Sequence, residues 1–372
     1  MKKFLLFLTI ACGAIVLSLR AGTNVGTALC PEDICLVVNE ASSNSIRVAE
    51  AYVKMRKIPA HHVITVNVPR EFYEIKSSLA PDEFTKMIWE PVQRTLEERK
   101  LSDKILALIY SCDFPIRIEA TPPLSITGIT FLRNSVPPGA PWDYGRYESV
   151  IFAGPKTEKQ SVRDSKSFAA IKALFPVSMP LPSMMLGYVQ ERGNTVEEVL
   201  ECLQRGVKSD KSAPRGIVYL AMNEDVRSLC RQWQFPEAAN RIRMFNKNVG
   251  VLNDKMLPNG EKLIGFMVGS AVPKPLKATF QHGAYADHLT SFAGAFDVHA
   301  QVKMSTWITQ GATATSGTVT EPFAVAAKFP DAYLFLHQQH GLTMIESIYL
   351  STLCPLQLLP LGEPLANPWK KK

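Results

Sequence analysis

The residue types best suited to chemistry gather around the first half of the stretch 283–322, where His, Asp, Ser and Thr lie among small residues. Ser291 could act as a nucleophile if His282 or His288 served as its base. Asp287 could then orient that base, as the acid of a catalytic triad does. In an extended strand, Asp287 and Ser291 fall on one face and His288 on the other. The alternative is that Ser291 is a small residue at a crowded strand end, and we favour that interpretation.

A second candidate nucleophile is Cys112, which follows the apolar run 104–111 directly and precedes Asp113. The carboxyl end of a parallel strand is where α/β sheets bind ligands. A thiolate there needs a cationic neighbour, and Arg117 is near in sequence. The alternative is a disulfide or a buried thiol, which we favour.

Polar residues at other predicted strand ends are candidates for ligand binding. Asn39 and Glu40 end the apolar run that begins at residue 34, and Thr320 and Glu321 precede a proline. Each could equally be a turn or cap residue. Together with Asp113, they are suited to hydrogen bonding with a small polar or peptide ligand. None is cationic, so a phosphate is not indicated.

Metal and cofactor sites have little support in the sequence. His337 and His340 have the i, i+3 spacing that lets two imidazoles share a metal on a helix, but no carboxylate or cysteine lies between them. We favour a solvated loop for this pair. No CxxC pair and no HExxH motif occurs. We therefore expect no metal and no cofactor.

The elements that must position these residues alternate along the chain. Apolar runs rich in β-branched residues, typical of buried parallel strands, alternate with segments of helical spacing, one of which is interrupted by Pro91. This alternation predicts right-handed βαβ units and one mainly parallel sheet. The predicted strands are 34–39, 63–68, 104–111, 184–189, 216–222 and 263–270.

A proline-rich segment, 115–182, interrupts the alternation. It contains ten of the 26 prolines, and its Trp142 and Phe152 need a surface on which to pack, so we expect an ordered insertion. The predicted organisation is a signal peptide at 1–21, a first α/β half at 22–114, the insertion, a second α/β half at 183–369, and a basic tail at 370–372.

The beginning of the chain resembles a secretion signal. Two lysines precede an apolar run at 4–19, and the residues 19–21 fit a cleavage site. We expect the mature protein to begin near Gly22 and to be exported, periplasmic or extracellular, with no membrane span after cleavage. An uncleaved anchor and a lipoprotein modified at Cys12 are the alternatives.

Charge and cysteine content narrow the function classes. The formal net charge of the chain is +7. Three of the basic residues lie in the leader and three in the tail, so the rest of the chain carries a net charge of +1. A nearly neutral body argues against a nucleic-acid partner. Loss of the leader leaves six cysteines, which in an oxidising compartment permit disulfides in 15 possible pairings. They are Cys30, Cys35, Cys112, Cys202, Cys230 and Cys354.

Four separated segments resemble, in the same order, an uncharacterised family of exported bacterial proteins. These segments are ICLVVNEASSNSIRVAEAYVKMRKIPAHHVITVNVP, ALIYSCDFPIRI, GAYADHLTSFAG with GATATSGTVTEP, and LGEPLANP. The resemblance covers nearly the whole mature chain, and such proteins often occur in genomes that encode a sorting system for C-terminally anchored proteins. The family has no established activity, but its layout is similar to the gingipain and caspase-like peptidases. This implies a doubly wound, mainly parallel α/β sheet with a Pro-rich insertion.

The chain departs from the peptidase pattern at the positions that matter for catalysis. Those peptidases place His-Gly after one strand and Ala-Cys after the next. Here the run 263–270 ends without a histidine, and Thr290-Ser291 stands where the cysteine would fall. His282-Gly283 precedes the later strand instead of following the earlier one, and Glu363 stands where the family more often has Asp.

Two functions remain open at this point. The first is an exported, non-catalytic cell-envelope or ligand-binding protein on a peptidase-like fold, with an unknown small polar or peptide ligand. The alternative is a peptidase-like hydrolase with a rearranged Ser291 or Cys112 site. A catalytic site requires nucleophile, base and orienting acid to converge. We also expect the strand ends to meet the stretch 283–322 and form the only sizeable polar pocket.

Overall fold

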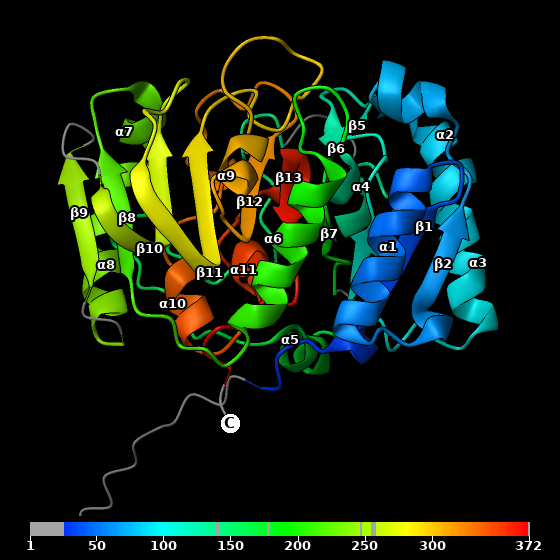
Figure 1. The fold of residues 1–372 in the computed structure, drawn as a ribbon, viewed down its shortest axis with the longest axis horizontal. Helices are drawn as coiled ribbons and strands as arrows, with labels where there is room; N and C mark the ends of the chain where they lie inside the picture. Colours follow the sequence, from blue (N-terminus) through cyan, green and yellow to red (C-terminus); the bar gives the residue numbers. More distant parts are fainter. Residues whose placement is uncertain (1–25, 138–141, 177–178, 246–247, 254–257, 371–372) are drawn as a thin grey trace, which may run out of the picture.

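The computed structural model describes residues 26–137, 142–176, 179–245, 248–253 and 258–370. The predicted signal peptide, which ends at residue 21, therefore lies outside the described residues. A ten-stranded sheet runs through the molecule, and Figure 1 shows β1, β2 and β8 to β11 pointing to the same, upper edge. Within the described ranges, no helix is long and apolar enough to cross a membrane.

The sheet is mainly parallel, and β12 and β13 form an antiparallel pair at its centre. In spatial order it consists of β2 (Val63–Val66), β1 (Ile34–Asn39), β4 (Ala107–Tyr110), β7 (Ser183–Met185), β13 (Leu358–Gly362), β12 (Ala314–Thr318), β11 (Lys277–Leu289), β10 (Asn259–Gly269), β8 (Ile217–Met222) and β9 (Val249–Asn253). A small second sheet contains β3 (Ser78–Leu79), β5 (Arg117–Ile118) and β6 (Leu124–Ser125).

Helices cover both faces of the large sheet. Asp287 and His288 are neighbours in β11 and point to opposite faces, where Asp287 contacts α7 and His288 contacts α9. The helices are α1 (Ser43–Arg56), α2 (Pro81–Phe84), α3 (Glu90–Glu98), α4 (Ile126–Phe131), α5 (Phe168–Leu174), α6 (Val196–Ser209), α7 (Val226–Gln232), α8 (Phe235–Arg243), α9 (Ser305–Thr309), α10 (Leu334–Gln339) and α11 (Met344–Leu350).

Local sequence signals account for several helix boundaries. The Ser42 hydroxyl accepts the Ser45 N–H at the start of α1, and Thr195 with Glu198 forms the expected capping box of α6. The interruption expected at Pro91 takes the form of a π-helical turn over Thr85–Trp89, immediately before α3. Proline has no N–H to donate to the preceding turn, so the regular α-helical ladder changes there.

Five predicted strands are confirmed in one mainly parallel sheet, as β1, β2, β4, β8 and β10. The predicted strand 184–189 is shorter, because β7 ends at Met185. β13 was not predicted as a strand, since it contains Pro360, a residue that usually argues against a central strand. β13 meets β7 through one register pair, Leu361 with Met185, so Pro360 interrupts no extended ladder on that side.

The described part of the segment 115–182 is ordered against the rest of the molecule. It supplies β5, β6, α4 and α5, and Trp142 is completely buried. The ring of Phe131 stacks on that of Tyr349 in α11, with centroids 5.4 Å apart. The insertion therefore packs on the C-terminal part of the chain.

Candidate functional site

Asp287 lies buried in β11, and side chains on its own face of the sheet donate hydrogen bonds to both of its carboxylate oxygens. Both of its carboxylate oxygens accept hydrogen bonds from the guanidinium of Arg231 in α7, each at 2.8 Å. The hydroxyl of Tyr285 donates a further bond to it at 3.1 Å. Asp287 is thus the partner of a buried arginine, and it does not orient a histidine.

His288 is a core residue on the opposite face. Its Nδ1 accepts the indole N–H of Trp307 at 2.8 Å, and its Nε2–H donates to the carbonyl of Val302 at 3.0 Å. Burial lowers the pKa of His288 to about 4, so the ring is neutral at physiological pH. Neither nitrogen is available to take a proton from Ser291.

His282 and Ser291 lie far apart along the chain direction of β11. His282 is exposed in the middle of the strand, seven positions or ~23 Å of extended chain before its last residue, and Ser291 follows the end of the strand. The carbonyl of Ser291 accepts the Thr318 hydroxyl at 3.0 Å. Within the described ranges, no hydrogen bond joins the Ser291 hydroxyl to a histidine. The candidates His282, His288, Asp287 and Ser291 are not brought together.

A cationic side chain that the sequence did not single out bonds to the residue after Ser291. The ammonium of Lys303 donates to the carbonyls of Phe292 and Ala300, both at 2.8 Å. Burial lowers the pKa of Lys303 to about 8. A lysine can serve as the base of a serine nucleophile, but among the described residues no hydrogen bond joins Lys303 to the Ser291 hydroxyl.

Cys112 is a buried, neutral thiol. Burial first, and the charge of Asp113 second, raise its pKa well above the ordinary value. Arg117, the expected cationic neighbour, pairs with Asp297 and donates to the Val319 carbonyl at 3.1 Å. All six described cysteines are free thiols, in contrast to the disulfides that their even number permitted.

Asp113 organises the carboxyl end of β4. Its Oδ2 accepts from Ser42 at 2.5 Å and from Asn44 at 3.2 Å, and its Oδ1 accepts from Gln190 at 2.5 Å. Asn39 donates through Nδ2 to the Asp113 carbonyl at 2.9 Å and to the Val68 carbonyl at 3.1 Å. The hydrogen-bonding capacity of both side chains is largely used inside the protein.

The other predicted binding residues have local roles. Glu40 is exposed and accepts a bond from Asn67 at 3.3 Å. Glu321 accepts the backbone N–H of Phe323 at 2.9 Å, as a turn residue does, and Thr320 beside it is half-buried. This hydrogen bond is the contact expected if Glu321 is a turn residue, which was one of its two predicted roles.

A polar cavity of about 170 Å³ lies at the carboxyl edge of the sheet, and we call it the carboxyl-edge pocket. The residues after β7 and the residues 296–299 both line it. None of the side chains predicted for binding or catalysis lines this pocket: Asn39, Glu40, Cys112, Asp113, His282, Asp287, Ser291, Thr320 and Glu321 all lie outside its lining. Its lining residues are Glu74, Ile75, Ser77, Tyr188, Gln190, Glu191, Arg192, Phe296, Asp297 and His299. A second cavity, of about 450 Å³, is larger and mostly apolar, and it lies against the insertion.

An aromatic pair forms the apolar surface of the carboxyl-edge pocket. The rings of Tyr188 and Phe296 stack with centroids 4.0 Å apart and planes 13° apart. The Tyr188 hydroxyl lies 3.3 Å from the Ser77 hydroxyl. Burial raises the pKa of Tyr188 to about 12, so the phenol remains a neutral hydrogen-bonding group.

Charged groups hold the two walls of the pocket together. Arg192 donates through Nε to the carbonyl of Phe296 at 2.5 Å, and its Nη1 lies 2.8 Å from both Glu191 and a ring nitrogen of His299. The half-buried pair Arg117 and Asp297 lies on the same side. The pocket therefore combines a flat aromatic wall with fixed guanidinium and carboxylate groups.

Three residues at this edge have left-handed backbone conformations without being glycine. Ser77, Asp113 and Arg192 have φ values of 55°, 57° and 62°. Such conformations cost free energy and gather at functional sites, where the surroundings impose them. Ser77 and Arg192 line the carboxyl-edge pocket, and Asp113 accepts a hydrogen bond from its lining residue Gln190.

Sequence analysis missed Tyr188, Gln190 and Arg192 because it assigned the residues up to 189 to a strand. Since β7 ends at Met185, these residues form the loop that leaves its carboxyl end. The signal was present, because loops after parallel strands build the ligand sites of α/β sheets.

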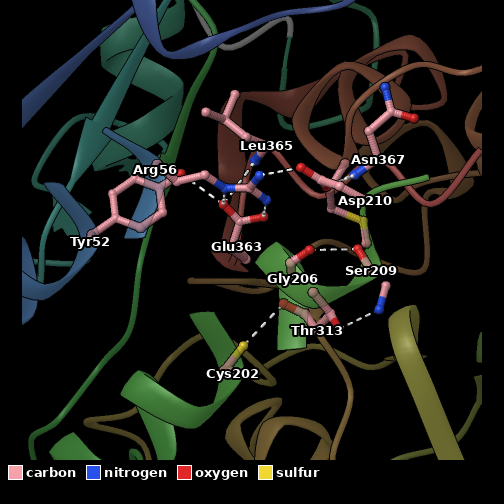
Figure 2. Close-up of polar contacts among 12 residues, drawn as sticks. Tyr52, Arg56, Cys202, Gly206, Ser209, Asp210, Thr313, Glu363, Leu365 and Asn367 are labelled. Atoms are coloured by element: carbon pink, nitrogen blue, oxygen red, sulfur yellow. Dashed lines mark hydrogen bonds and ion pairs between the residues drawn. The ribbon is translucent and has the colours of Figure 1, made fainter. Parts of the chain in front are cut away.

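The most extensive buried charge network lies elsewhere and joins the first helix to the end of β13 (Figure 2). Arg56 donates to both carboxylate oxygens of Glu363, at 2.9 and 2.6 Å, and Tyr52 donates to the same carboxylate at 2.8 Å. Arg56 also reaches Asp210 at 2.5 Å. A Cβ on Gly206 would lie 2.5 Å from the Glu363 side chain, so only glycine fits there. Glu363, in the segment LGEPLANP, is therefore held by side chains of α1 and has a structural role.

His337 is buried in α10 and His340, just past the end of that helix, is half-buried, so the expected solvated loop is wrong. Ser165 bridges the two rings, with its hydroxyl 2.7 Å from Nδ1 of His337 and 2.6 Å from Nδ1 of His340. Burial lowers the pKa of His337 to about 3. Among the described residues, no group of three or more His, Cys, Asp or Glu side chains could hold a metal ion.

Comparison with known proteins adds one distant similarity. No family model matches the chain, and no curated protein matches it. Among solved structures, the fold is similar to that of the Arg-specific cysteine proteinase gingipain R, with a TM-score of 0.40 and 9% sequence identity over 90% of this chain and 78% of that chain. At this distance, no residue role and no activity is transferred.

Proposed function

We propose that this protein is an exported, non-catalytic protein that binds a small polar or peptide ligand in the carboxyl-edge pocket. The observation that carries the proposal is the pocket itself, with its stacked Tyr188 and Phe296 and the fixed guanidinium of Arg192. Pockets of this kind use an aromatic surface for contact area and a few polar groups for orientation.

The geometry around the candidate nucleophiles supports the absence of catalysis. A general base must lie within hydrogen-bond reach of the group it deprotonates. Both nitrogens of His288 are occupied, and Cys112 is held neutral in the core. The candidate base His288 and the candidate thiol Cys112 are therefore engaged in the core.

The ligand class follows from the groups on the pocket walls. A guanidinium binds carboxylates, and an amide such as that of Gln190 exchanges hydrogen bonds with peptide groups. The neutral phenol of Tyr188 can donate as well as accept. A dipeptide or similar small polar molecule matches this combination. The two lysines and the apolar run at the beginning of the chain support export, so the protein would bind this ligand outside the cytoplasm.

The test uses a panel of dipeptides and measures the melting temperature of the protein, which a bound ligand raises. We expect at least one dipeptide to raise the melting temperature of the native protein. The variant Arg192→Asn, which tolerates the left-handed backbone, should lose that rise. Arg241→Gln on exposed α8 is the control and should keep it. A panel without effect, or equal shifts in both variants, would refute the proposed ligand class.

One observation favours the hydrolase alternative, namely the desolvated Lys303, whose ammonium bonds the carbonyl of Phe292, the residue after Ser291. Labelling with a fluorophosphonate and with iodoacetamide separates the two functions. We expect neither Ser291 nor Cys112 to react in the folded protein. Stoichiometric fluorophosphonate labelling that is lost in both Ser291→Ala and Lys303→Met would overturn the non-catalytic proposal.

A further inference from the structure

The cavity of about 450 Å³ beside the insertion has a character different from the carboxyl-edge pocket. The two cavities share no lining residue. Its volume lies in the range of ligand pockets in proteins. The floor is apolar and buried, and includes Ile151, Ala153 and Ile171.

The rim of this cavity exposes large apolar side chains to water. Val150, Leu174 and Phe175 are 50%, 59% and 49% exposed, and all three line the cavity. Single exposed apolar residues are common, but three around one apolar cavity form a continuous patch. Such patches mark surfaces that bind apolar groups.

The charged residues at the rim indicate the polar end of the occupant. Arg163, Asp164 and Lys166 line the cavity and carry a net charge of +1. None of the three forms a salt bridge with another residue in the described ranges. Two cations beside an apolar cavity complement a ligand that has an anionic head and an apolar chain.

We propose that this cavity binds a soluble, monoanionic amphiphile of the medium-chain carboxylate class. The alkyl chain lies against the apolar floor, and the carboxylate lies at the rim with Arg163 and Lys166. This site is independent of the peptide-binding function proposed for the carboxyl-edge pocket, and either can hold without the other.

The first test is calorimetric titration of the full chain with decanoate at pH 8, below its micellar concentration. We expect saturable binding of one decanoate per protein. Decyltrimethylammonium has the same chain with the opposite charge and should bind at least tenfold more weakly. Absence of saturable decanoate binding, or equal affinity for the cation, would overturn the proposal.

Matched variants locate the site. Leu174→Glu places a carboxylate at the rim and should abolish decanoate binding. Leu229→Glu on α7, where the leucine is 53% exposed and does not line the cavity, should leave it unchanged. Both changes are at exposed positions, so both variants should fold. Decanoate binding that survives Leu174→Glu would exclude this cavity.

Charge variants test the head group. Arg163→Gln with Lys166→Gln should weaken decanoate at least fivefold and leave decanol binding unchanged. The control, Lys54→Gln with Lys159→Gln, removes the same charge at exposed positions that do not line the cavity. Equal weakening by both pairs would overturn the direct contact. Association with anionic vesicles in the absence of decanoate binding would also overturn the proposal, in favour of a membrane-surface role.

Discussion

The buried side chains of β11 are held by specific partners, and His288 is the clearest case. Its ring accepts the Trp307 indole N–H and donates to the Val302 carbonyl. Strand periodicity correctly separates His288 from Asp287, since alternate residues face opposite ways. Ser291 lies beyond the end of the strand, so this periodicity does not extend to it. The two partners of His288, Val302 and Trp307, lie 14 and 19 positions later in the chain, in a loop and in the short helix α9. No local sequence pattern predicts that these segments pack against His288.

Replacement of His288 by Phe should destabilise the fold at pH 7 without affecting any ligand-binding property. The change leaves the Trp307 N–H and the Val302 carbonyl buried without this hydrogen-bond partner. Each such group lowers the free energy of unfolding by about 1–3 kcal/mol. Urea unfolding measures the loss. His282→Gln, at an exposed position in the middle of the strand, is the control and should change stability by less than about 0.5 kcal/mol. An unfolding midpoint unchanged in His288→Phe would contradict the structural role.

Asp331 gives a prediction with a defined pH dependence. The carboxyl is buried, its Oδ1 accepts the Tyr333 N–H at 2.9 Å, and its Oδ2 has no partner among the described residues. Burial raises the pKa of Asp331 well above its ordinary value of 3.8. The folded chain therefore keeps a proton that the unfolded chain has lost, so this group costs stability as the pH rises above that value.

The variant Asp331→Asn removes the titrating group and keeps the acceptor for Tyr333. We expect its melting temperature to exceed that of the native protein by several degrees at pH 7 and to match it near pH 3.5. Thermal unfolding followed across that pH range checks the result. A constant difference at every pH would show that the effect is not titration of Asp331.

At the scale of the elements, the sequence predicts a strand or helix well where the signal lies within the element's own residues. The β-branched runs of β1 and β8 and the capping box of α6 are local signals, and each corresponds to an observed element. β13 shows the limit, because Pro360 opposes a strand locally while the pairing with β12 supplies it. The pocket loop 188–192 shows a second limit, since its position depends on where β7 ends.

Helix α1 offers a direct comparison of a buried and an exposed ion pair. Glu363→Gln leaves Arg56 buried without a full counter-charge and should cost about 3–5 kcal/mol. Arg47 of α1 forms a second ion pair with Glu197 of α6 in solvent, with side chains 57% and 65% exposed. Glu197→Gln is therefore the control and should cost less than about 1 kcal/mol.

Chemical denaturation of the two variants measures both values. Arg56 and Glu363 also tie the first helix to the last strand, so Glu363→Gln should lower the midpoint of the whole transition. Similar small losses in both variants would indicate that water reaches the Arg56 side chain after the substitution and that the network is not essential.

At the scale of the molecule, the two halves separated in the sequence by the proline-rich segment share one sheet. β7, the first strand of the second half, pairs in parallel with β4, the last large-sheet strand of the first half, so the halves meet there in one sheet. One continuous hydrophobic core includes residues from both sides, such as Val37 and Tyr285. The chain order alone indicates two α/β halves, whereas the pairing of β4 with β7 and the shared core make them a single body.

This arrangement predicts that the protein unfolds in one cooperative step. Trp142 in the insertion and Trp307 in α9 are both buried and report on distant parts of the chain. Single-tryptophan variants that retain one or the other should show the same midpoint in urea, and that midpoint should coincide with loss of helical circular dichroism. Because β4 and β7 pair with each other, neither half can leave the sheet without exposing a strand edge and the core beneath it. Two separate midpoints, with Trp307 responding before Trp142 or after it, would show that the halves are independently stable and that the pairing of β4 with β7 does not couple them.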